Sequence, residues 1–209
     1  MYKFKNFVHP LFASNTYVIY KENSNECIII DPTDIAFRDL ARFLENNNLK
    51  PISIINTHGH YDHISGIDLV RETYKIPLYI HKNEEEFLRN PELNLSIYLG
   101  KNLIIKPAEY YVNDNDEIMG FKIIHTPGHT PGSICLKVEN ILIVGDLIFL
   151  NSIGRVDLPL SSEEDMRNSL IKILNYIDED TTILPGHGRS FKLEDLKREN
   201  EILWSFINF

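Results

Sequence analysis

The sequence predicts an α/β fold of the α+β kind, a four-layer αββα sandwich in which two mixed β-sheets pack face to face with helices outside. The order of elements supports this: strand signals open the chain, strand–helix pairs follow, and a second block of strands precedes a final strand–helix pair. No linker, repeat or low-complexity segment interrupts the 209 residues, a length that fits one domain. We therefore expect a single domain spanning residues 1–209.

The first half of the chain begins as an antiparallel meander. Strand signals lie at residues 3–8, 15–20 and 27–30, separated by turn-forming residues. The spacing of apolar residues then predicts a helix, a strand, a helix and a strand at residues 37–44, 51–56, 64–75 and 77–80. Residues 82–100 are less regular, with short helical patterns at 84–88 and 93–99. The acidic run there predicts a solvated face, and the segment is a candidate substrate-facing insertion.

The second half returns to strands before it ends in helices. Strands are predicted at residues 109–112, 118–124, 133–138 and 141–144, with a tight turn at 139–140. A helix from residue 161 to 177 and a strand at 181–184 follow. One terminal helix is predicted over residues 193–206, with Leu196, Ile202, Leu203 and Phe206 on its buried side.

Composition and charge exclude several classes of protein. A hydrophobic content of 43% and a charged content of 24% are typical of a globular protein. The net charge of -9 repels phosphate backbones, which argues against nucleic-acid binding. Cys27 and Cys135 lie in apolar runs and are predicted to be buried, reduced thiols. Without a signal peptide or an apolar run of membrane-spanning length, the sequence predicts a cytoplasmic protein that does not bind a membrane.

One short stretch, residues 57–63, carries a dense group of metal-ligand side chains. It contains His58, His60, Asp62 and His63. Imidazole nitrogen and carboxylate oxygen suit zinc, iron or manganese. Crowding these groups away from water is costly unless a cation lies among them. The stretch therefore predicts a metal site.

Three later strands also end at residues that can bind a metal. His129, Asp146 and His187 follow the strands predicted at 118–124, 141–144 and 181–184, and each has a glycine beside it. If these strands and the strand at 51–56 run in the same direction, all four loops open at one edge. Asp31 follows the strand at 27–30. It either caps the turn or hydrogen-bonds the metal-binding loop from behind.

This pattern resembles a known family. His58-x-His60-x-Asp62-His63, followed by His129, Asp146 and His187, is similar to the full signature of the metallo-β-lactamase-fold hydrolases. Within that superfamily, five segments resemble glyoxalase II, above all its short, hydroxyacylglutathione hydrolase-like relatives. These segments are Asp31-Pro32, residues 125–133, Gly145-Asp146, residues 154–159 and residues 185–188.

The resemblance implies the metallo-β-lactamase fold and a binuclear site. His58, His60 and His129 would bind one metal; Asp62, His63 and His187 would bind the other; Asp146 would bridge the two. Each metal would then have an open position, which is typical of catalytic sites. Zinc is the expected metal, with iron and manganese as alternatives.

The implied function is hydrolysis of a small-molecule thioester of the hydroxyacylglutathione type. A hydroxide shared by two metals would attack the thioester carbonyl, and a thiolate would leave. Asp62 and Asp146 would be the catalytic residues, with Asp62 orienting the nucleophile. Arg155 and Asp157 would brace the loop after Asp146 through an ion pair, or else contact the substrate.

The chain departs from glyoxalase II in two respects. Because only about twenty residues follow His187, we expect the protein to lack the C-terminal helical domain that binds glutathione in glyoxalase II. Thr33 stands where a glycine usually follows the Asp-Pro pair. The thiol and acyl group of the substrate, and the oligomeric state, therefore do not follow from the sequence.

Alternative functions share the same scaffold. A mononuclear-iron persulfide dioxygenase has a similar Gly-Arg-x-Asp segment, and a lactonase has the same seven ligands. A metal-binding relative with a silent site is the non-enzyme alternative. Of the other histidines, we expect His9 and His81 at the surface or in loops. His125 is interpreted as a neighbour that supports the ligand loop rather than as a ligand.

Overall fold

The computed structural model describes residues 1–208 and contains two mixed β-sheets, each with helices packed against it. The predicted fold class is confirmed in these respects. The chain divides into two compact units, of which unit 1 is Met1–Tyr111 and unit 2 begins at Val112. Each unit is described separately below, and the single domain expected from the sequence stays a prediction.

The first sheet has the strand order β1-β2-β3-β4-β5-β6. Its strands are β1 (Tyr2–Val8), β2 (Asn15–Lys21), β3 (Glu26–Ile30), β4 (Lys50–Ile55), β5 (Leu78–His81) and β6 (Tyr110–Val112). The pairs β1–β2 and β2–β3 are antiparallel, as the predicted meander requires, whereas β3–β4 and β4–β5 are parallel. Because β3 and β4 are parallel neighbours, Asp31 and the histidine-rich stretch at residues 57–63 emerge at the same edge of the sheet.

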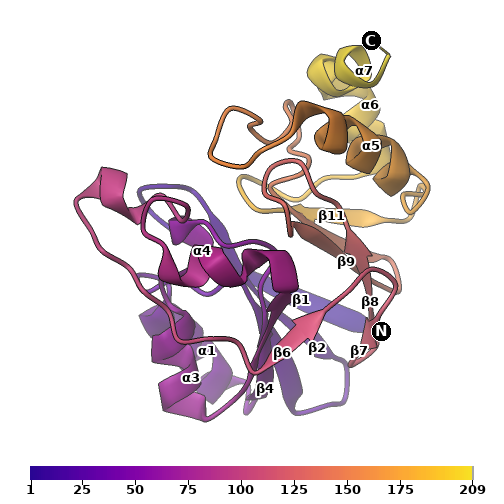
Figure 1. Ribbon diagram of the computed structural model, residues 1–209. Helices are drawn as coiled ribbons and strands as arrows, with labels where there is room; N and C mark the ends of the chain where they lie inside the picture. Colours follow the sequence, from indigo (N-terminus) through magenta and orange to yellow (C-terminus); the bar gives the residue numbers. More distant parts are fainter. Residues whose placement is uncertain (209) are drawn as a thin grey trace. The chain divides into compact units, whose positions relative to one another are not determined.

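The helices of unit 1 are α1 (Phe37–Asn46), α2 (Tyr61–Ile64), α3 (Ile67–Tyr74) and α4 (Glu85–Arg89), with short 3-10 helices η1 (Lys82–Glu84) and η2 (Ser96–Leu99). Helices α1 and α3 lie on the same side of the first sheet (Figure 1) and share one apolar cluster with β2–β5. Alternate residues of the strands, such as Val18, Ile29 and Ile54, contribute to that cluster. Their packing makes the sheet a rigid base for the loops at its edge.

The helix predicted at residues 64–75 is present as α3, which begins three residues later than predicted, and a separate short helix, α2, precedes it. α2 ends at Ile64 and α3 begins at Ile67. A Cβ atom added to Gly66, between the two, would lie 2.5 Å from the backbone carbon of Thr33. Glycine therefore permits a close approach between two backbones at this break. As a result, Asp62 and His63 occupy a separate helical turn of their own.

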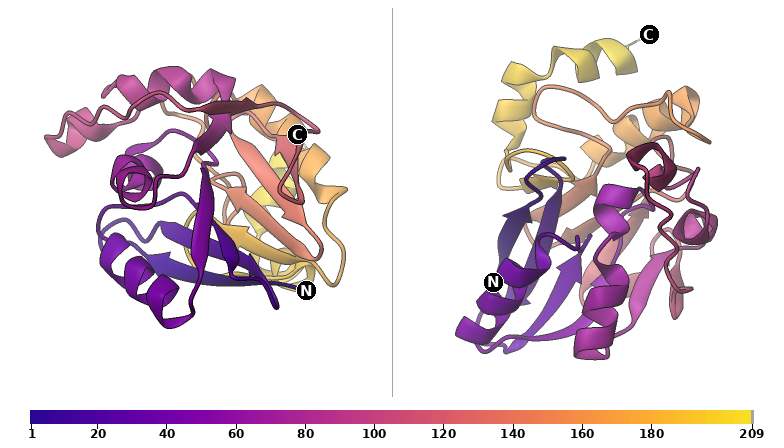
Figure 2. Two further views of the ribbon diagram at one scale, coloured as in Figure 1. Left: turned by 90° about the horizontal axis from the view of Figure 1, so that it is seen from below. Right: turned by 90° about the vertical axis from the view of Figure 1, so that its left-hand side faces the viewer.

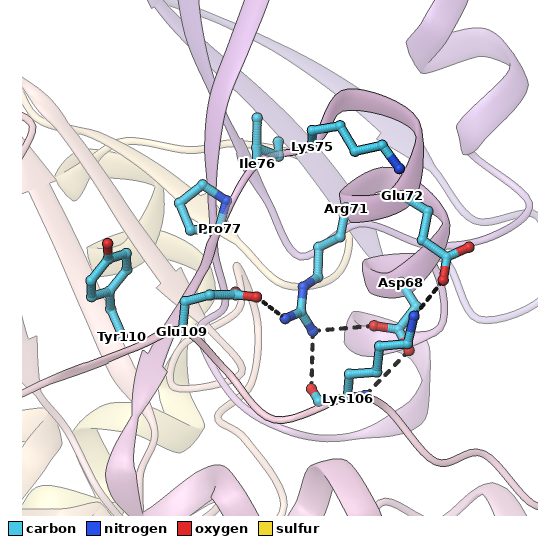
Figure 3. Close-up of a pocket in the computed structure, with 9 residues that line it drawn as sticks. All are labelled: Asp68, Arg71, Glu72, Lys75, Ile76, Pro77, Lys106, Glu109 and Tyr110. Carbon is cyan, nitrogen blue, oxygen red and sulfur yellow. Dashed lines mark hydrogen bonds and ion pairs between the residues drawn. The ribbon is translucent and has the colours of Figure 1, made fainter.

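An ion-pair network attaches the segment before β6 to α3 (Figure 3). Arg71 donates to the backbone carbonyls of Lys106 and Pro107, at 3.0 and 2.9 Å, and to the carboxylates of Asp68 and Glu109. Burial alone would raise the pKa of Glu109. However, hydrogen bonds from the Leu78 N–H and from Arg71 outweigh it, and the pKa is lowered. Arg71 thus holds the segment before β6 against α3. We therefore assign a structural role to the pocket that Arg71, Lys106 and Glu109 line.

The second sheet has the order β11-β10-β9-β8-β7. Its strands are β7 (Glu117–Ile118), β8 (Phe121–His125), β9 (Ile134–Val138), β10 (Ile141–Gly145) and β11 (Thr182–Pro185). The single strand predicted at residues 118–124 is wrong, since β7 and β8 form a hairpin around Met119 and Gly120. Both residues have positive φ, 51° and 85°, as the tightest hairpin turns require. Methionine is not a typical residue for such a turn, which explains why the sequence pattern missed it.

Three helices cover one face of the second sheet: α5 (Glu163–Leu174), α6 (Leu193–Glu199) and α7 (Glu201–Ile207) (Figure 2). Met166, Leu170 and Ile173 of α5 pack in the same apolar cluster as alternate residues of β10. Both cysteines are buried, as predicted, and burial raises the pKa of the Cys27 and Cys135 thiols to about 12. Among residues 1–208, no helix combines the length and apolar character needed to cross a membrane.

The single terminal helix predicted over residues 193–206 is broken at Asn200. This residue has φ -108° and ψ 73°, and its side chain accepts a hydrogen bond from the Leu203 N–H at 2.8 Å, so that it caps α7. The break shifts the helical phase. Leu196 and Leu203 are buried as predicted, but Ile202 is 51% exposed. The prediction for Ile202 was therefore wrong.

Candidate metal centre

Unit 1 brings the four predicted ligands of residues 57–63 together. The rings of His58 and His60 lie edge to face with centroids 5.0 Å apart, and those of His58 and His63 lie 4.3 Å apart. His63 Nε2 is 3.6 Å from Asp62 Oδ2. The chain is extended up to His60 and helical from Tyr61, and this change of conformation directs side chains close in sequence to one place.

Asp31 hydrogen-bonds this stretch, which decides between its two predicted roles. Its Oδ1 accepts from the Thr57 N–H at 2.7 Å, and its Oδ2 accepts from Thr57 Oγ1 at 2.6 Å. Oδ2 also lies 3.0 Å from His63 Nδ1. Donation of the Nδ1 hydrogen to this carboxylate fixes the ring and leaves Nε2 as the ligand nitrogen.

Asp31 could in principle be a ligand rather than a support, because one ligand atom each from Asp31, His58 and His63 lie within 4.8 Å of one another. Both of its carboxylate oxygens, however, already accept short hydrogen bonds from Thr57. We therefore assign Asp31 the role of orienting His63.

The peptide groups of the stretch are also held from several directions. Asn56 Nδ2 donates to the carbonyl of His58 at 2.8 Å and to that of His63 at 3.3 Å. Ser14 Oγ donates to the carbonyl of Asp62 at 2.8 Å. Backbone positions are thus set by side chains from outside the stretch, as a preorganised ligand loop requires.

Unit 2 places its three predicted ligands at one edge of the second sheet. β8 and β10 are both antiparallel to β9, and β11 is parallel to β10, so β8, β10 and β11 run in the same direction. The loops after these strands carry His129, Asp146 and His187. The expectation of a common strand direction is thus confirmed for the three strands of this unit.

Asp146 lies between the two histidines of unit 2. Its Oδ2 is 3.5 Å from His129 Nε2 and 3.3 Å from His187 Nε2. Both distances exceed those of a good hydrogen bond between nitrogen and oxygen. Two imidazole nitrogens converging on one carboxylate oxygen suit a cation held on each side of that oxygen. The donor set of unit 2 therefore fits a shared carboxylate between two metals.

Backbone contacts orient these ligands. The carbonyl of Arg155 lies 2.9 Å from His129 Nδ1, which directs Nε2 toward Asp146. A Cβ atom added to Gly154 would lie 1.8 Å from the carbonyl oxygen of Asp146, so only glycine fits where these backbones meet.

The predicted ion pair between Arg155 and Asp157 is present. Arg155 Nε and Nη2 donate to the two carboxylate oxygens of Asp157 at 2.8 and 2.9 Å. The hydrogen bond from Arg155 lowers the pKa of Asp157. Both side chains are largely exposed, at 67% and 69%, so screening by solvent keeps the stabilisation small. The contact of this segment with His129 runs through the backbone of Arg155.

Two buried residues near the candidate ligands were not predicted from the sequence. Asn200 donates from Nδ2 to the carbonyls of Phe149 and Ser152, both at 2.8 Å. The ring of Phe149 lies edge to face with His187 at 5.8 Å. An asparagine within a predicted helix is itself a signal of a cap, which could have indicated the break at Asn200.

Glu84 is the second residue that was missed, and its predicted solvated position is wrong. It is fully buried, and its Oε2 accepts from the Gly59 N–H at 2.7 Å. Three consecutive glutamates precede Phe87, and nothing in the sequence pattern distinguishes the one that turns inward.

The remaining histidines differ partly from expectation. His9 lies in a loop, but it is only 1% exposed, and its Nδ1 accepts from the N–H groups of Leu11 and Phe12. His81 ends β5 and is 7% exposed. The expected surface or loop position is therefore confirmed for His9, which lies in a loop although it is buried, and is wrong for His81. His125 Nε2 lies 3.0 Å from the carbonyl of Pro131 and so contacts the loop that carries His129, in agreement with a supporting role.

Comparison with known proteins agrees with this geometry. The model of the Metallo-beta-lactamase superfamily matches residues 9–187. A probable metallo-hydrolase of Bacillus subtilis, YqgX, is 32% identical over 206 residues, covering 95% of this chain and 96% of that protein.

Two solved structures are similar over nearly the whole chain. BLEG-1, described as a B3 metallo-beta-lactamase, has a TM-score of 0.88 and 34% identity, and the match covers 96% of this chain and 99% of BLEG-1. A protein crystallised in a di-iron-bound form has a TM-score of 0.84 and 26% identity, with 94% and 98% of the two chains covered. With this fold, these ligand-type residues and the match over residues 9–187, the chain belongs to the metallo-β-lactamase superfamily.

Proposed function

We propose that this protein is a metal-dependent hydrolase that cleaves thioesters of the hydroxyacylglutathione type. One observation carries the hydrolase part of the proposal: Asp146 Oδ2 lies between His129 Nε2 and His187 Nε2, at 3.5 and 3.3 Å. A carboxylate oxygen that faces two imidazoles supports a bridge between two cations rather than a closed structural site. The relatives named as metallo-hydrolases support the same class of reaction.

The proposed ligand set follows from this role of Asp146. His58, His60 and His129 would hold one ion, Asp62, His63 and His187 would hold the other, and Asp146 would be shared between them. The ions would be divalent, and zinc is the expected metal. Iron is the alternative, because a similar solved structure is in a di-iron-bound form. Such a pair of ions lowers the pKa of a shared water and neutralises charge on the reacting oxygens.

The residues of the chain contribute orientation and proton transfer. Asp62 accepts the proton of the attacking water and keeps the nucleophile aimed at the carbonyl carbon. Asp31 holds His63 through Nδ1, and the carbonyl of Arg155 holds His129 in the same way. Fixing both rings removes the need to reorganise ligands during the reaction.

The choice of a thioester rests on the similarity to short glyoxalase II relatives in residues 125–133, 154–159 and 185–188. A thiolate is a good leaving group and needs no strong general acid, which suits a ligand set made only of histidines and aspartates. A specific observation favours a second candidate, β-lactam hydrolysis: BLEG-1 is 34% identical and matches nearly the full length.

The experiment that tests the function is a substrate panel on one sample of purified protein with its metal content measured. The panel contains lactoylglutathione, acyl thioesters of smaller thiols, a lactone, a cephalosporin, and glutathione persulfide with oxygen uptake recorded. We expect the highest kcat/KM for a thioester. Higher kcat/KM for the cephalosporin would favour the second candidate. Oxygen uptake with the persulfide, in protein that contains one bound iron, would show that the protein is a dioxygenase and not a hydrolase.

Asp146→Ala tests the bridge. We expect turnover to fall by about 100-fold or more and the content of bound metal to fall with it, because both ions lose a ligand. Asp180→Ala, which removes an exposed acid of unit 2, is the matched control and should change neither quantity. Full activity in Asp146→Ala would refute the assignment.

A further inference from the structure

Glu84 is a fully buried carboxylate that contacts the metal-binding stretch of unit 1. It is the last residue of η1, it has 0% exposure, and its Oε2 accepts a hydrogen bond from the Gly59 N–H at 2.7 Å. Gly59 lies between His58 and His60. Burying a carboxylate is costly unless its interactions offset the lost hydration. The position of this hydrogen bond, between two candidate ligands, gives the carboxylate a direct influence on both.

Gly59 lies in close contact with Glu84 and Phe87. A Cβ atom added to Gly59 would lie 2.4 Å from Phe87 Cβ and 3.0 Å from Glu84 Oε2. The ring of Phe87 also lies edge to face with His60 at 5.9 Å. The glycine therefore lies directly against the turn from η1 to α4, and the hydrogen bond that its N–H donates to Glu84 sets the orientation of its peptide plane.

A second carboxylate holds the chain on the other side of His58. Asp31 Oδ1 accepts from the Thr57 N–H at 2.7 Å, the same distance as that from the Gly59 N–H to Glu84. The N–H groups just before and just after His58 are thus both donated to buried carboxylates from distant parts of the chain. Asp31 also contacts the ring of His63. Glu84 instead accepts from the N–H of Gly59, the residue between His58 and His60 in the sequence.

We propose that Glu84 is a positioning residue for the metal that His58 and His60 bind. Its carboxylate fixes the Gly59 peptide, and the peptide fixes the separation of the two imidazoles. Its negative charge also favours a cation nearby. The inference rests on the proposed metal site and extends it to a residue outside the seven ligands.

The test is the zinc affinity of three variants of the full-length protein. Metal-free protein is titrated with Zn²⁺ in competition with a chromophoric chelator, and with Co²⁺ while the visible absorption spectrum is recorded. We expect Glu84→Gln, which keeps an oxygen acceptor but loses the charge, to weaken one of the two bound zinc ions by about 10-fold, and Glu84→Ala by up to about 100-fold. The Co²⁺ spectrum of that site should change in both. The control, Glu86→Gln, alters an exposed glutamate of the same run and should match the wild type.

The melting temperature of the metal-free protein separates positioning from a merely structural role. We expect Glu84→Gln to melt at the wild-type temperature without metal and below it with zinc. A variant that melts lower without metal and binds both ions equally weakly would overturn the proposal, as would wild-type zinc affinity in both variants at position 84. If Glu84→Ala fails to fold, Glu84→Gln decides. Because zinc binding is measured apart from turnover, an inactive protein with normal zinc binding would contradict only the thioesterase function.

Discussion

At the scale of single residues, carboxylates outside the proposed ligand set hold the proposed histidine ligands in place. Asp31 follows β3 and reaches Thr57 and His63 across 26 and 32 positions of sequence. Donation of the Nδ1 hydrogen to Asp31 leaves Nε2 as the nitrogen of His63 that is available to a metal. A histidine without this partner would keep its ligand atom but would lose its fixed tautomer and orientation.

Asp31→Asn should therefore lower kcat and metal affinity by about 10- to 100-fold each, because the amide cannot accept hydrogen bonds at both of its terminal atoms. The measurement is steady-state kinetics on a thioester, together with zinc content after dialysis. Asp39→Asn, at an exposed acid in the first turn of α1, is the control. Wild-type metal content and kcat in Asp31→Asn would show that the histidine is held by other contacts.

At the scale of elements, the loops that carry ligands depend on segments that carry none. The loop after β10 contains Phe149, which contacts His187, and its backbone is held by Asn200 between α6 and α7. One buried amide side chain thus caps α7 and donates hydrogen bonds to two carbonyl groups of the loop. The terminal helices consequently influence the position of a proposed ligand without contributing one.

Asn200→Ala should reduce the free energy of unfolding by about 2–4 kcal/mol, since it leaves two carbonyl groups and one N–H without their buried partner. Urea denaturation of the metal-free protein measures this quantity. Asn175→Ala, at an exposed position after α5, should change it by less than about 0.5 kcal/mol. We also expect a lower kcat, because Phe149 would no longer be held against His187. An unchanged unfolding free energy would contradict the role assigned to this amide.

At the scale of the whole molecule, the proposed ligand set draws on both units. Residues 57–63 contribute four of the seven ligands, and the loops after β8, β10 and β11 contribute the other three. A metal that requires ligands so far apart in sequence binds the folded chain and not the unfolded one. Its binding free energy therefore adds to stability.

Removal of metal by a chelator should lower the melting temperature, and added zinc should restore it. At a free zinc concentration about 1,000 times the dissociation constant, the expected stabilisation is about 4 kcal/mol. Thermal denaturation followed by circular dichroism over a series of zinc concentrations tests this. In Asp146→Ala the dependence on zinc should shrink. A melting temperature independent of metal in the wild type would argue against the proposed metal site.

The sequence by itself determined the ligand types, the strands that precede them and the class of fold. These follow from local patterns: short apolar runs in β4, β8, β10 and β11, and polar residues where each strand ends. The positions of those residues could be predicted because a strand and the loop after it are read from neighbouring positions. The role of Asp31 was one of two predicted alternatives, and its contact with His63 was needed to choose between them.

Only the tertiary structure decided which of three adjacent glutamates turns inward, where the terminal helix breaks, and that residues 117–125 form a hairpin. Glu84 reaches the Gly59 N–H across 25 positions, and Asn200 reaches Phe149 across 51. Hydrogen-bond partners so distant in sequence leave no periodic signal, because periodicity reports only which face of an element is buried. The chemistry of the ligands is therefore local in the sequence, whereas the contacts that hold them arise only from folding.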